Sequence, residues 1–204
     1  MEIIPAILER ELKSVLRKIE IARSLGVETV QLDVMDGVFV NNTSYGVPDH
    51  HLASCRMNLE VHLMVANPLA EMARWRRLRN AKRAIIHWEA APEKNLNQKF
   101  FLSIALNPDT PISVLKPHLG RINHVLMMGV RPGWSGQKFD RSVLDKIKAF
   151  KMLEGAKHIT VGVDGGVNRD TAPLLNDAGA DILNVASFLW QGDIQENYRW
   201  LKSL

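Results

Sequence analysis

The chain has 204 residues, which suits one compact domain or an α/β barrel at the small end of its size range. Its 46% hydrophobic and 24% charged residues exclude a disordered or fibrous protein, and its single cysteine, Cys55, excludes a disulfide framework and a cysteine-based zinc site. The N-terminal residues lack a signal-peptide pattern, and no run of about 18 apolar residues occurs, so we expect a cytoplasmic protein without a membrane partner.

The formal net charge of +4 raises the question of nucleic-acid binding. Basic residues crowd the stretch from Arg74 to Arg83, where Trp75 and Leu78 recur at helical spacing. This pattern favours a helix that packs its apolar residues inward and exposes its basic residues to solvent. The sequence has no zinc-finger, RNA-recognition or heptad signature, so we predict no nucleic-acid partner.

Short apolar or β-branched runs alternate with amphipathic stretches along the chain. The expected strands cover residues 3–7, 29–34, 58–64, 84–87, 101–106, 124–128, 158–163 and 182–185. The clearest helical patterns cover residues 12–22, 143–150 and 171–178, the last with Asp170 as its N-cap and an end before Gly179. The unit at residues 91–99 is short and polar for a barrel helix. Eight alternating units predict a (β/α)₈ TIM barrel that forms a single domain over residues 1–204.

Such a barrel places functional groups where its strands end. The second expected strand carries Gln31 and Asp33 on one face, because strand side chains alternate between faces. The third strand delivers His62, and the seventh delivers Asp164. One imidazole, one amide and two carboxylates are therefore expected to converge from three strands.

The sequence around these positions resembles the ribulose-phosphate 3-epimerase family over nearly the whole chain. The matching segments are PAIL at 5–8, DVMDG at 33–37, FV at 39–40, VHLMV at 61–65, NP at 67–68, ALNP at 105–108, TP at 110–111, PG at 132–133, GQ at 136–137, DGG at 164–166 and GAD at 179–181, together with Asn42, His87, Glu89 and Ala90. The resemblance implies a phosphosugar epimerase that inverts C3 of D-ribulose 5-phosphate and D-xylulose 5-phosphate. It also implies one divalent metal ion and a homo-oligomer.

The chain departs from the family pattern at several positions. Gln31 stands where the family has a metal-binding histidine, and Ala6 stands where it has a serine near the substrate. Arg131 replaces an asparagine, Ala186 replaces a glycine, and the stretch between residues 90 and 105 is shorter. Two alternatives therefore stay open: a non-catalytic phosphosugar-binding homologue, and an epimerase of a related ketose phosphate such as allulose 6-phosphate.

The chemistry of C3 inversion assigns roles to the converging residues. Loss of the C3 proton forms an enediolate, which a divalent cation stabilises as a Lewis acid. Inversion needs a base on each face of C3, and Asp33 and Asp164 are the expected bases. With His62 and Gln31 they are also the expected ligands of Mn, Mg, Zn or Fe, because two buried carboxylates need a counter-charge. In the alternative, a protonated His62 supplies that charge and no metal binds.

The other expected substrate-binding residues lie at strand ends and in the loops that follow. Met35, Met64 and Met128 would line the floor of the pocket or simply fill the barrel. Backbone N–H groups would hold the phosphate, and the expected residues are Gly133, Trp134, Ser135, Gly136, Gly165, Gly166, Ala186 and Ser187. We interpret residues 131–137 as a lid or a rigid connection, Arg131 as solvent-facing, and His87 as a core histidine bonded to backbone.

Overall fold

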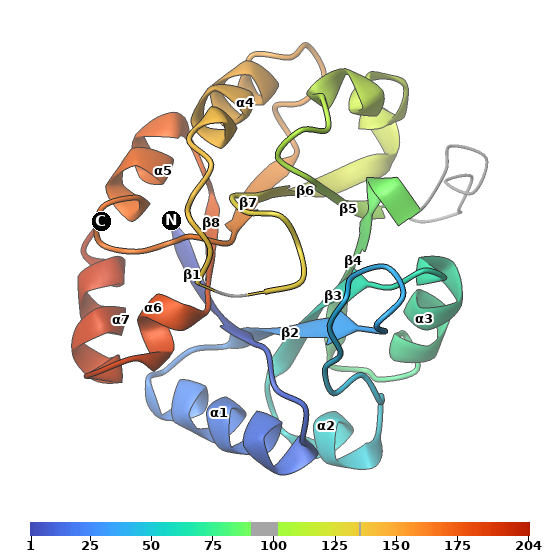
Figure 1. The fold of residues 1–204 in the computed structure, drawn as a ribbon, viewed down its shortest axis with the longest axis vertical. Coiled ribbons are helices and arrows are strands. Elements are labelled where there is room, and N and C mark those ends of the chain that lie inside the picture. Colours follow the sequence, from blue (N-terminus) through green and yellow to red (C-terminus); the bar gives the residue numbers. More distant parts are fainter. Residues whose placement is uncertain (91–101, 135) are drawn as a thin grey trace.

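The structure is a computed structural model and describes residues 1–90, 102–134 and 136–204. Its strands close into one parallel barrel in chain order, from β1 to β8 and back to β1 (Figure 1). They are β1 (Glu2–Ile7), β2 (Thr29–Met35), β3 (Asn58–Met64), β4 (Ala81–His87), β5 (Leu102–Leu106), β6 (Ile122–Met128), β7 (Thr160–Asp164) and β8 (Ile182–Val185). The predicted (β/α)₈ barrel is confirmed.

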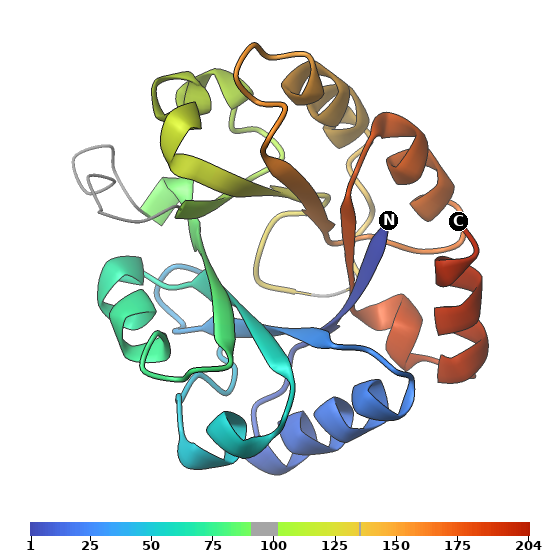
Figure 2. The same ribbon diagram turned by 180° about the vertical axis from the view of Figure 1, so that it is seen from behind.

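Helices surround the barrel, as the views from both ends show (Figures 1 and 2). They are α1 (Leu12–Ser24), α2 (His50–Ser54), α3 (Pro68–Trp75), η1 (Trp88–Ala90), η3 (Ile112–Arg121), α4 (Ser142–Lys151), α5 (Ala172–Ala178), α6 (Ser187–Trp190) and α7 (Ile194–Lys202). None of the helices in the described residues is long and apolar enough to span a membrane.

The expected elements are present, with bounds that differ by a few residues. Helix α5 ends at Gly179, whose φ of +97° is the left-handed conformation that glycine adopts readily. The prediction of Asp170 as its N-cap is wrong, because Thr171 occupies that position. The side-chain oxygen of Asn168 instead accepts from the backbone N–H groups of Asp170 and Thr171 at 2.8 and 3.1 Å. The expected weak unit at residues 91–99 lies outside the described residues.

The basic stretch after residue 73 is helical only at its start. Helix α3 ends at Trp75, which is fully buried as expected, and Leu78 lies in the following turn. The prediction of a continuous solvated helix face is wrong for Arg83. This residue lies in β4 and forms an ion pair with the buried Glu60, because strand alternation turns its side chain toward the barrel interior.

The hydrophobic core has an outer layer between strands and helices and a smaller inner part. Leu32 and Val34 belong to the outer layer, whereas Met35 packs with Val40 and Met64 in an inner cluster. A second inner cluster consists of Ile85, Ala105, Leu126 and Met128. Because β2 directs Leu32 and Val34 outward, its alternate residues are directed into the barrel, as the sequence predicted.

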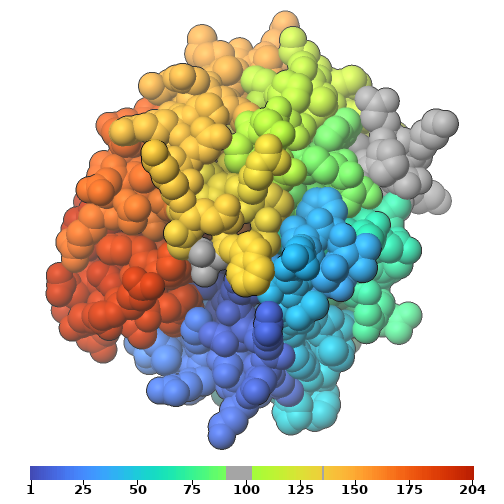
Figure 3. All heavy atoms as spheres, in the orientation of Figure 1, coloured from blue at the N-terminus to red at the C-terminus, as the bar shows by residue number. Residues whose placement is uncertain are grey.

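The segment after β6 lies over the mouth of the barrel. In Figure 1 this yellow part of the chain crosses in front of the strand ends, and in Figure 3 its atoms lie over the centre of the same face. Asn42 Nδ2 donates to Gly133 O at 2.8 Å and ties the segment to the loop after β2. Gln137 Nε2 donates to the carbonyl oxygens of Arg131 and Trp134 at 2.7 and 2.8 Å. The segment is thus held both internally and to a neighbouring loop.

Candidate active site

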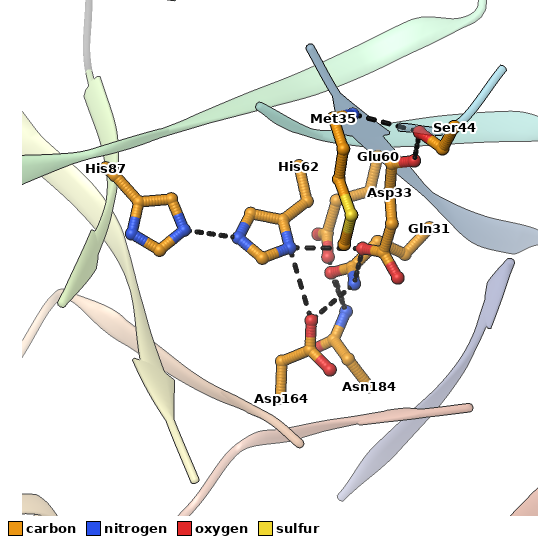
Figure 4. Close-up of polar contacts among 9 residues, drawn as sticks. All are labelled: Gln31, Asp33, Met35, Ser44, Glu60, His62, His87, Asp164 and Asn184. Atoms are coloured by element: carbon orange, nitrogen blue, oxygen red, sulfur yellow. Dashed lines mark hydrogen bonds and ion pairs between the residues drawn. The ribbon is translucent and has the colours of Figure 1, made fainter. Parts of the chain in front are cut away.

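Three strands bring Asp33, His62 and Asp164 together at the mouth of the barrel (Figure 4). Asp33 on β2 and His62 on β3 are register partners, so the parallel pairing alone places them side by side. His62 Nδ1 lies 3.1 Å from Asp33 Oδ1 and 3.3 Å from Asp164 Oδ2. All three side chains are buried. The convergence expected from the sequence therefore exists for these residues.

This trio is chemically suited to a divalent cation. Each residue offers one ligand atom, and these atoms all lie within 4.8 Å of one another. Carboxylate oxygens and imidazole nitrogens are ligands that Mn, Fe, Zn and Mg accept to different degrees. Two carboxylates carry the formal charge that a divalent cation would neutralise. The donor set fits the expected metal ion.

Without a cation, the imidazole of His62 supplies the positive charge that offsets the two carboxylates. Burial raises the pKa of Asp33, and the charge of Asp164 raises it further against the opposing hydrogen bonds from His62 and Gln31. Burial lowers the pKa of His62, but the hydrogen bonds and charges of Asp164 and Asp33 outweigh this effect and raise the pKa to about 9. A protonated His62 is therefore the counter-charge of the metal-free site at neutral pH.

A second histidine fixes the orientation of the first. His62 Nε2 lies 2.8 Å from His87 Nε2, and His87 Nδ1 lies 3.2 Å from Glu89 Oε2. Glu89 also accepts from the N–H of Asn107 at 2.9 Å and from the hydroxyl of Thr110. Burial raises the pKa of Glu89, but its hydrogen bonds, with His87 first among them, lower it to about 2. An ionised Glu89 accepts the Nδ1 proton of His87, so His87 Nε2 accepts from His62 and leaves His62 Nδ1 facing the carboxylates.

The prediction that His87 bonds to backbone is wrong, since its partners are the side chains of His62 and Glu89. Burial lowers the pKa of His87 to about 4, so it is neutral near pH 7. The His-x-Glu spacing of residues 87 and 89 was a signal for this pair, because it places the carboxylate just beyond the end of β4.

Gln31 lies beneath the two aspartates and contacts both. Its Nε2 donates to Asp33 Oδ1 at 2.8 Å and to Asp164 Oδ2 at 2.7 Å (Figure 4). Its Oε1 accepts from Asn184 Nδ2 at 2.7 Å. The amide nitrogen, and not the oxygen that would bind a metal, therefore faces the carboxylates.

Sequence reasoning missed a set of polar residues further inside the barrel. Asn184 Nδ2 also donates to Glu60 Oε1 at 2.6 Å, and Arg83 pairs with the other oxygen of Glu60. Burial raises the pKa of Glu60 against the charge of Arg83. Glu60 precedes His62 by two residues on β3, so strand alternation could have placed it inside. His124 is also fully buried in β6, and within the described residues neither of its ring nitrogens has a hydrogen-bond partner.

A cavity at the mouth of the barrel joins the trio to most of the expected substrate-binding residues. The residues that line it include Asp33, His62, Asp164, Met35, Met64, Met128, Gly133, Trp134, Gly136, Gly165, Gly166, Ala186 and Ser187. Ser135 lies outside the described residues. Arg131 also borders the cavity, but its side chain is 71% exposed and pairs with Asp109 at 3.2 Å. Ala6 is buried, and its carbonyl accepts from Trp190 Nε1 at 2.6 Å.

The glycines after β7 are required by the close packing of that loop. Gly165 has a φ of +94°, and a Cβ there would lie 2.5 Å from the side chain of Val130. Gly166 has a φ of +71°, and its Cβ would lie 2.9 Å from Phe139. Any other residue would clash and adopt a strained backbone, so both positions require glycine.

Comparison with solved structures identifies the fold. Thiamine phosphate pyrophosphorylase from Pyrococcus furiosus aligns with a TM-score of 0.58 over 99% of this chain and 94% of its own, at 13% identity. The enzyme of the same name from Bacteroides thetaiotaomicron aligns with a TM-score of 0.53 over 100% of this chain and 96% of its own, at 14% identity. At such identities the likeness shows the fold alone.

Sequence comparison identifies the family. The model of the ribulose-phosphate 3-epimerase family matches residues 2–190. Ribulose-phosphate 3-epimerase from Bacillus subtilis strain 168 is 33% identical over 93% of this chain and 92% of its own. The enzymes of that name from Chlamydia pneumoniae and Methanocaldococcus jannaschii are 35% and 34% identical over 82% and 92% of this chain, and over 78% and 83% of their own. The chain therefore belongs to the ribulose-phosphate 3-epimerase family and to the isomerase class of enzymes.

Proposed function

We propose that this protein interconverts D-ribulose 5-phosphate and D-xylulose 5-phosphate by inverting the configuration at C3. The observation that carries the proposal is the placement of Asp33 and Asp164. These carboxylates come from β2 and β7, are both buried, and border one cavity at the mouth of the barrel. Inversion requires a proton acceptor on each face of the carbon, and two carboxylates from separate strands supply that pair.

The two aspartates would exchange roles between the two directions of the reaction. One carboxylate removes the C3 proton from its face, and the acid form of the other delivers a proton to the opposite face. Their burial limits the access of bulk water. Met35, Met64 and Met128 border the cavity and offer a polarisable apolar surface to the planar part of the intermediate.

Asp33, His62 and Asp164 would hold one divalent cation of the Mn, Mg, Zn or Fe type. When bound, such a cation supplies Lewis-acid stabilisation of the negative charge that develops on the sugar oxygens. His87 and Glu89 would keep His62 in the tautomer that presents Nδ1 to the carboxylates.

The phosphate group would bind to backbone N–H groups of the loops after β7 and β8. Gly165, Gly166, Ala186 and Ser187 all border the cavity there, on the loops where such barrels commonly hold phosphate. The segment of Gly133, Trp134 and Gly136 closes the other side of the mouth. We also expect the chain to work as a homo-oligomer in the cytoplasm, as its sequence resemblance implies.

The test is hydrogen exchange at C3 of D-ribulose 5-phosphate in deuterated solvent, followed by NMR with and without added Mn²⁺. We expect deuterium at C3 and formation of D-xylulose 5-phosphate, both faster with Mn²⁺. Tight binding without exchange would reveal a phosphosugar-binding homologue instead. The same assay is run with allulose 6-phosphate, and exchange of its C3 hydrogen alone would show that the substrate is this longer ketose phosphate. As a matched control, Asp177→Asn changes an exposed aspartate on α5 and should leave the rate unchanged.

A further inference from the structure

The orientation of the Gln31 amide is set by a chain of hydrogen bonds that crosses the barrel interior. Arg83 on β4 pairs with Glu60 on β3, and Glu60 accepts from Asn184 on β8. Asn184 donates to Gln31 on β2, and Gln31 donates to the two aspartates (Figure 4). We call Arg83, Glu60, Asn184 and Gln31 the donor ladder.

Every hydrogen of the two amide groups in the ladder has an acceptor. The two N–H bonds of Asn184 point to Glu60 Oε1 at 2.6 Å and to Gln31 Oε1 at 2.7 Å. The two N–H bonds of Gln31 point to Asp33 at 2.8 Å and Asp164 at 2.7 Å. An amide nitrogen has two hydrogens, so neither group has a donor left over.

The ladder cannot be reversed without loss of its contacts. A reversed Gln31 would place its oxygen against two carboxylates and its NH₂ against the NH₂ of Asn184. A reversed Asn184 would in turn place its oxygen against Oε1 of Glu60, whose other oxygen accepts from Arg83. Unpaired buried donors and acceptors are costly, and Gln31, Glu60 and Asn184 are buried, whereas the side chain of Arg83 is 29% exposed. In the observed orientation Asn184 Oδ1 lacks a hydrogen-bond partner among the described residues, while all four N–H bonds of the two amides are paired.

The geometry points to Gln31 as a positioning residue. We propose that the donor ladder holds the NH₂ group of Gln31 as a clamp between Asp33 and Asp164, and that Gln31 is not a ligand of the metal ion. The cation would then have three protein ligands, Asp33, His62 and Asp164. The three-ligand metal site rests on the proposed function. The contacts of Gln31 with the two aspartates do not, because they form without a metal or a substrate.

The clamp and the cation would stabilise the same pair of charges. The NH₂ hydrogens are partly positive and contact the same carboxylate oxygens that His62 faces. A bound cation takes over the neutralisation of these oxygens, so the contribution of Gln31 to stability should shrink when the metal binds. A ligand would behave in the opposite way, and a residue that only packs would contribute equally in both states.

The test compares the melting temperatures of wild type and Gln31→Leu, each free of metal and saturated with Mn²⁺. We expect the variant to melt about 4 °C or more below wild type without metal. We expect this difference in melting temperature to narrow with Mn²⁺. Only tighter Mn²⁺ binding by the variant can narrow it, so the Mn²⁺ Kd of the variant from calorimetry should be lower than that of wild type. His62→Leu should weaken Mn²⁺ binding by about 100-fold or more.

Asn184→Leu tests the part of the ladder beyond Gln31. Its melting temperature should also lie below that of wild type without metal, and this difference should narrow with Mn²⁺. As the matched control, Asn197→Leu removes a buried asparagine that bonds to backbone carbonyls outside the ladder. The difference in melting temperature between this variant and wild type should be the same with and without Mn²⁺. A gap for Gln31→Leu that widens with Mn²⁺, or a Kd weakened about tenfold or more, would overturn the proposal in favour of a metal ligand. An unchanged gap would overturn it in favour of simple packing.

A measurement on wild type alone covers the case in which these variants do not fold or Mn²⁺ does not bind. In metal-free protein labelled with ¹⁵N and ¹³C, scalar couplings across hydrogen bonds should connect Nε2 of Gln31 to the carboxyl carbons of Asp33 and Asp164. Absence of these couplings would refute the clamp. None of these measurements uses turnover, so a failure to epimerise ribulose 5-phosphate would leave the clamp standing.

Discussion

Replacement of one aspartate by asparagine should separate the two halves of the proposed reaction. Asp33 and Asp164 lie on different strands and border the same cavity. If each carboxylate serves one face of C3, Asp164→Asn retains only Asp33 as a base, and Asp33→Asn retains only Asp164. The amide keeps the shape of the side chain but cannot accept the C3 proton.

The size of the effect follows from the roles of the two carboxylates. A positioned general base contributes about 10²- to 10⁴-fold to rate, so each variant should lose about 3–5 kcal/mol of transition-state stabilisation. Substrate affinity should change by less than about tenfold, or roughly 1.4 kcal/mol, because the phosphate would be held by the loops after β7 and β8. Mn²⁺ is kept at saturation so that a weakened metal site does not imitate the loss of a base.

The assay follows deuterium at C3 of each pentulose phosphate separately. One variant should exchange the C3 hydrogen of ribulose 5-phosphate without inversion, and the other that of xylulose 5-phosphate. Asp177→Asn serves as the control for a charge lost from the surface. Epimerisation near the wild-type rate in either variant would refute the assignment of two bases, as would loss of exchange from both epimers in the same variant while the metal stays bound.

Further predictions concern the supports of the site and the fold. Glu89→Gln should weaken Mn²⁺ binding by about 10- to 100-fold in calorimetry, since the amide can turn either its oxygen or its NH₂ toward His87 and no longer fixes the tautomer. Burial, together with the hydrogen bond to Asp49 and its charge, raises the pKa of Tyr45 from 10.0 to about 12. The stability from this neutral tyrosine is therefore present below pH 10.0 and lost as the pH rises toward about 12, and Asp49→Asn should shift the absorbance titration of Tyr45 toward lower pH. Trp75→Ala should lower the free energy of unfolding by about 3–5 kcal/mol in denaturant titration, because Trp75 is fully buried in the outer core.

The barrel and the central trio could be predicted because both depend on local patterns. Alternating apolar runs and amphipathic stretches predicted strands in their observed order. Once β2 and β3 are parallel neighbours, the register places Asp33 next to His62. Asp164 ends β7 and reaches the same mouth because all strands of the barrel point one way.

The orientation of Gln31 could not be predicted in this way. Its partner Asn184 is 153 residues away in the sequence, and Asn184 in turn bonds to Glu60 at a separation of 124 residues. An amide group has a donor and an acceptor of the same size, so the residue type alone does not say which one faces the site. That choice depends on partners that only the closed barrel brings together.

The error at Arg83 has a related cause. Basic residues recur so often between positions 74 and 83 that helical spacing could be traced through the whole stretch. The chain leaves the helix at Trp75 and enters β4 at Ala81, where alternation by two replaces the helical period. An arginine on the inner face of a strand needs a buried acid, and Glu60 on the neighbouring strand supplies it.

These contacts change the reason for expecting a particular metal. An amide oxygen of Gln31 in the ligand set would favour Mn²⁺ or Mg²⁺ over zinc or iron. With the Gln31 nitrogen facing the carboxylates, the protein ligands would reduce to two carboxylates and one imidazole, a set that Mn, Fe and Zn all accept. Metal preference would then follow the general order of divalent affinities and the supply of each ion. The amide would instead stabilise the carboxylate pair when no ion is bound.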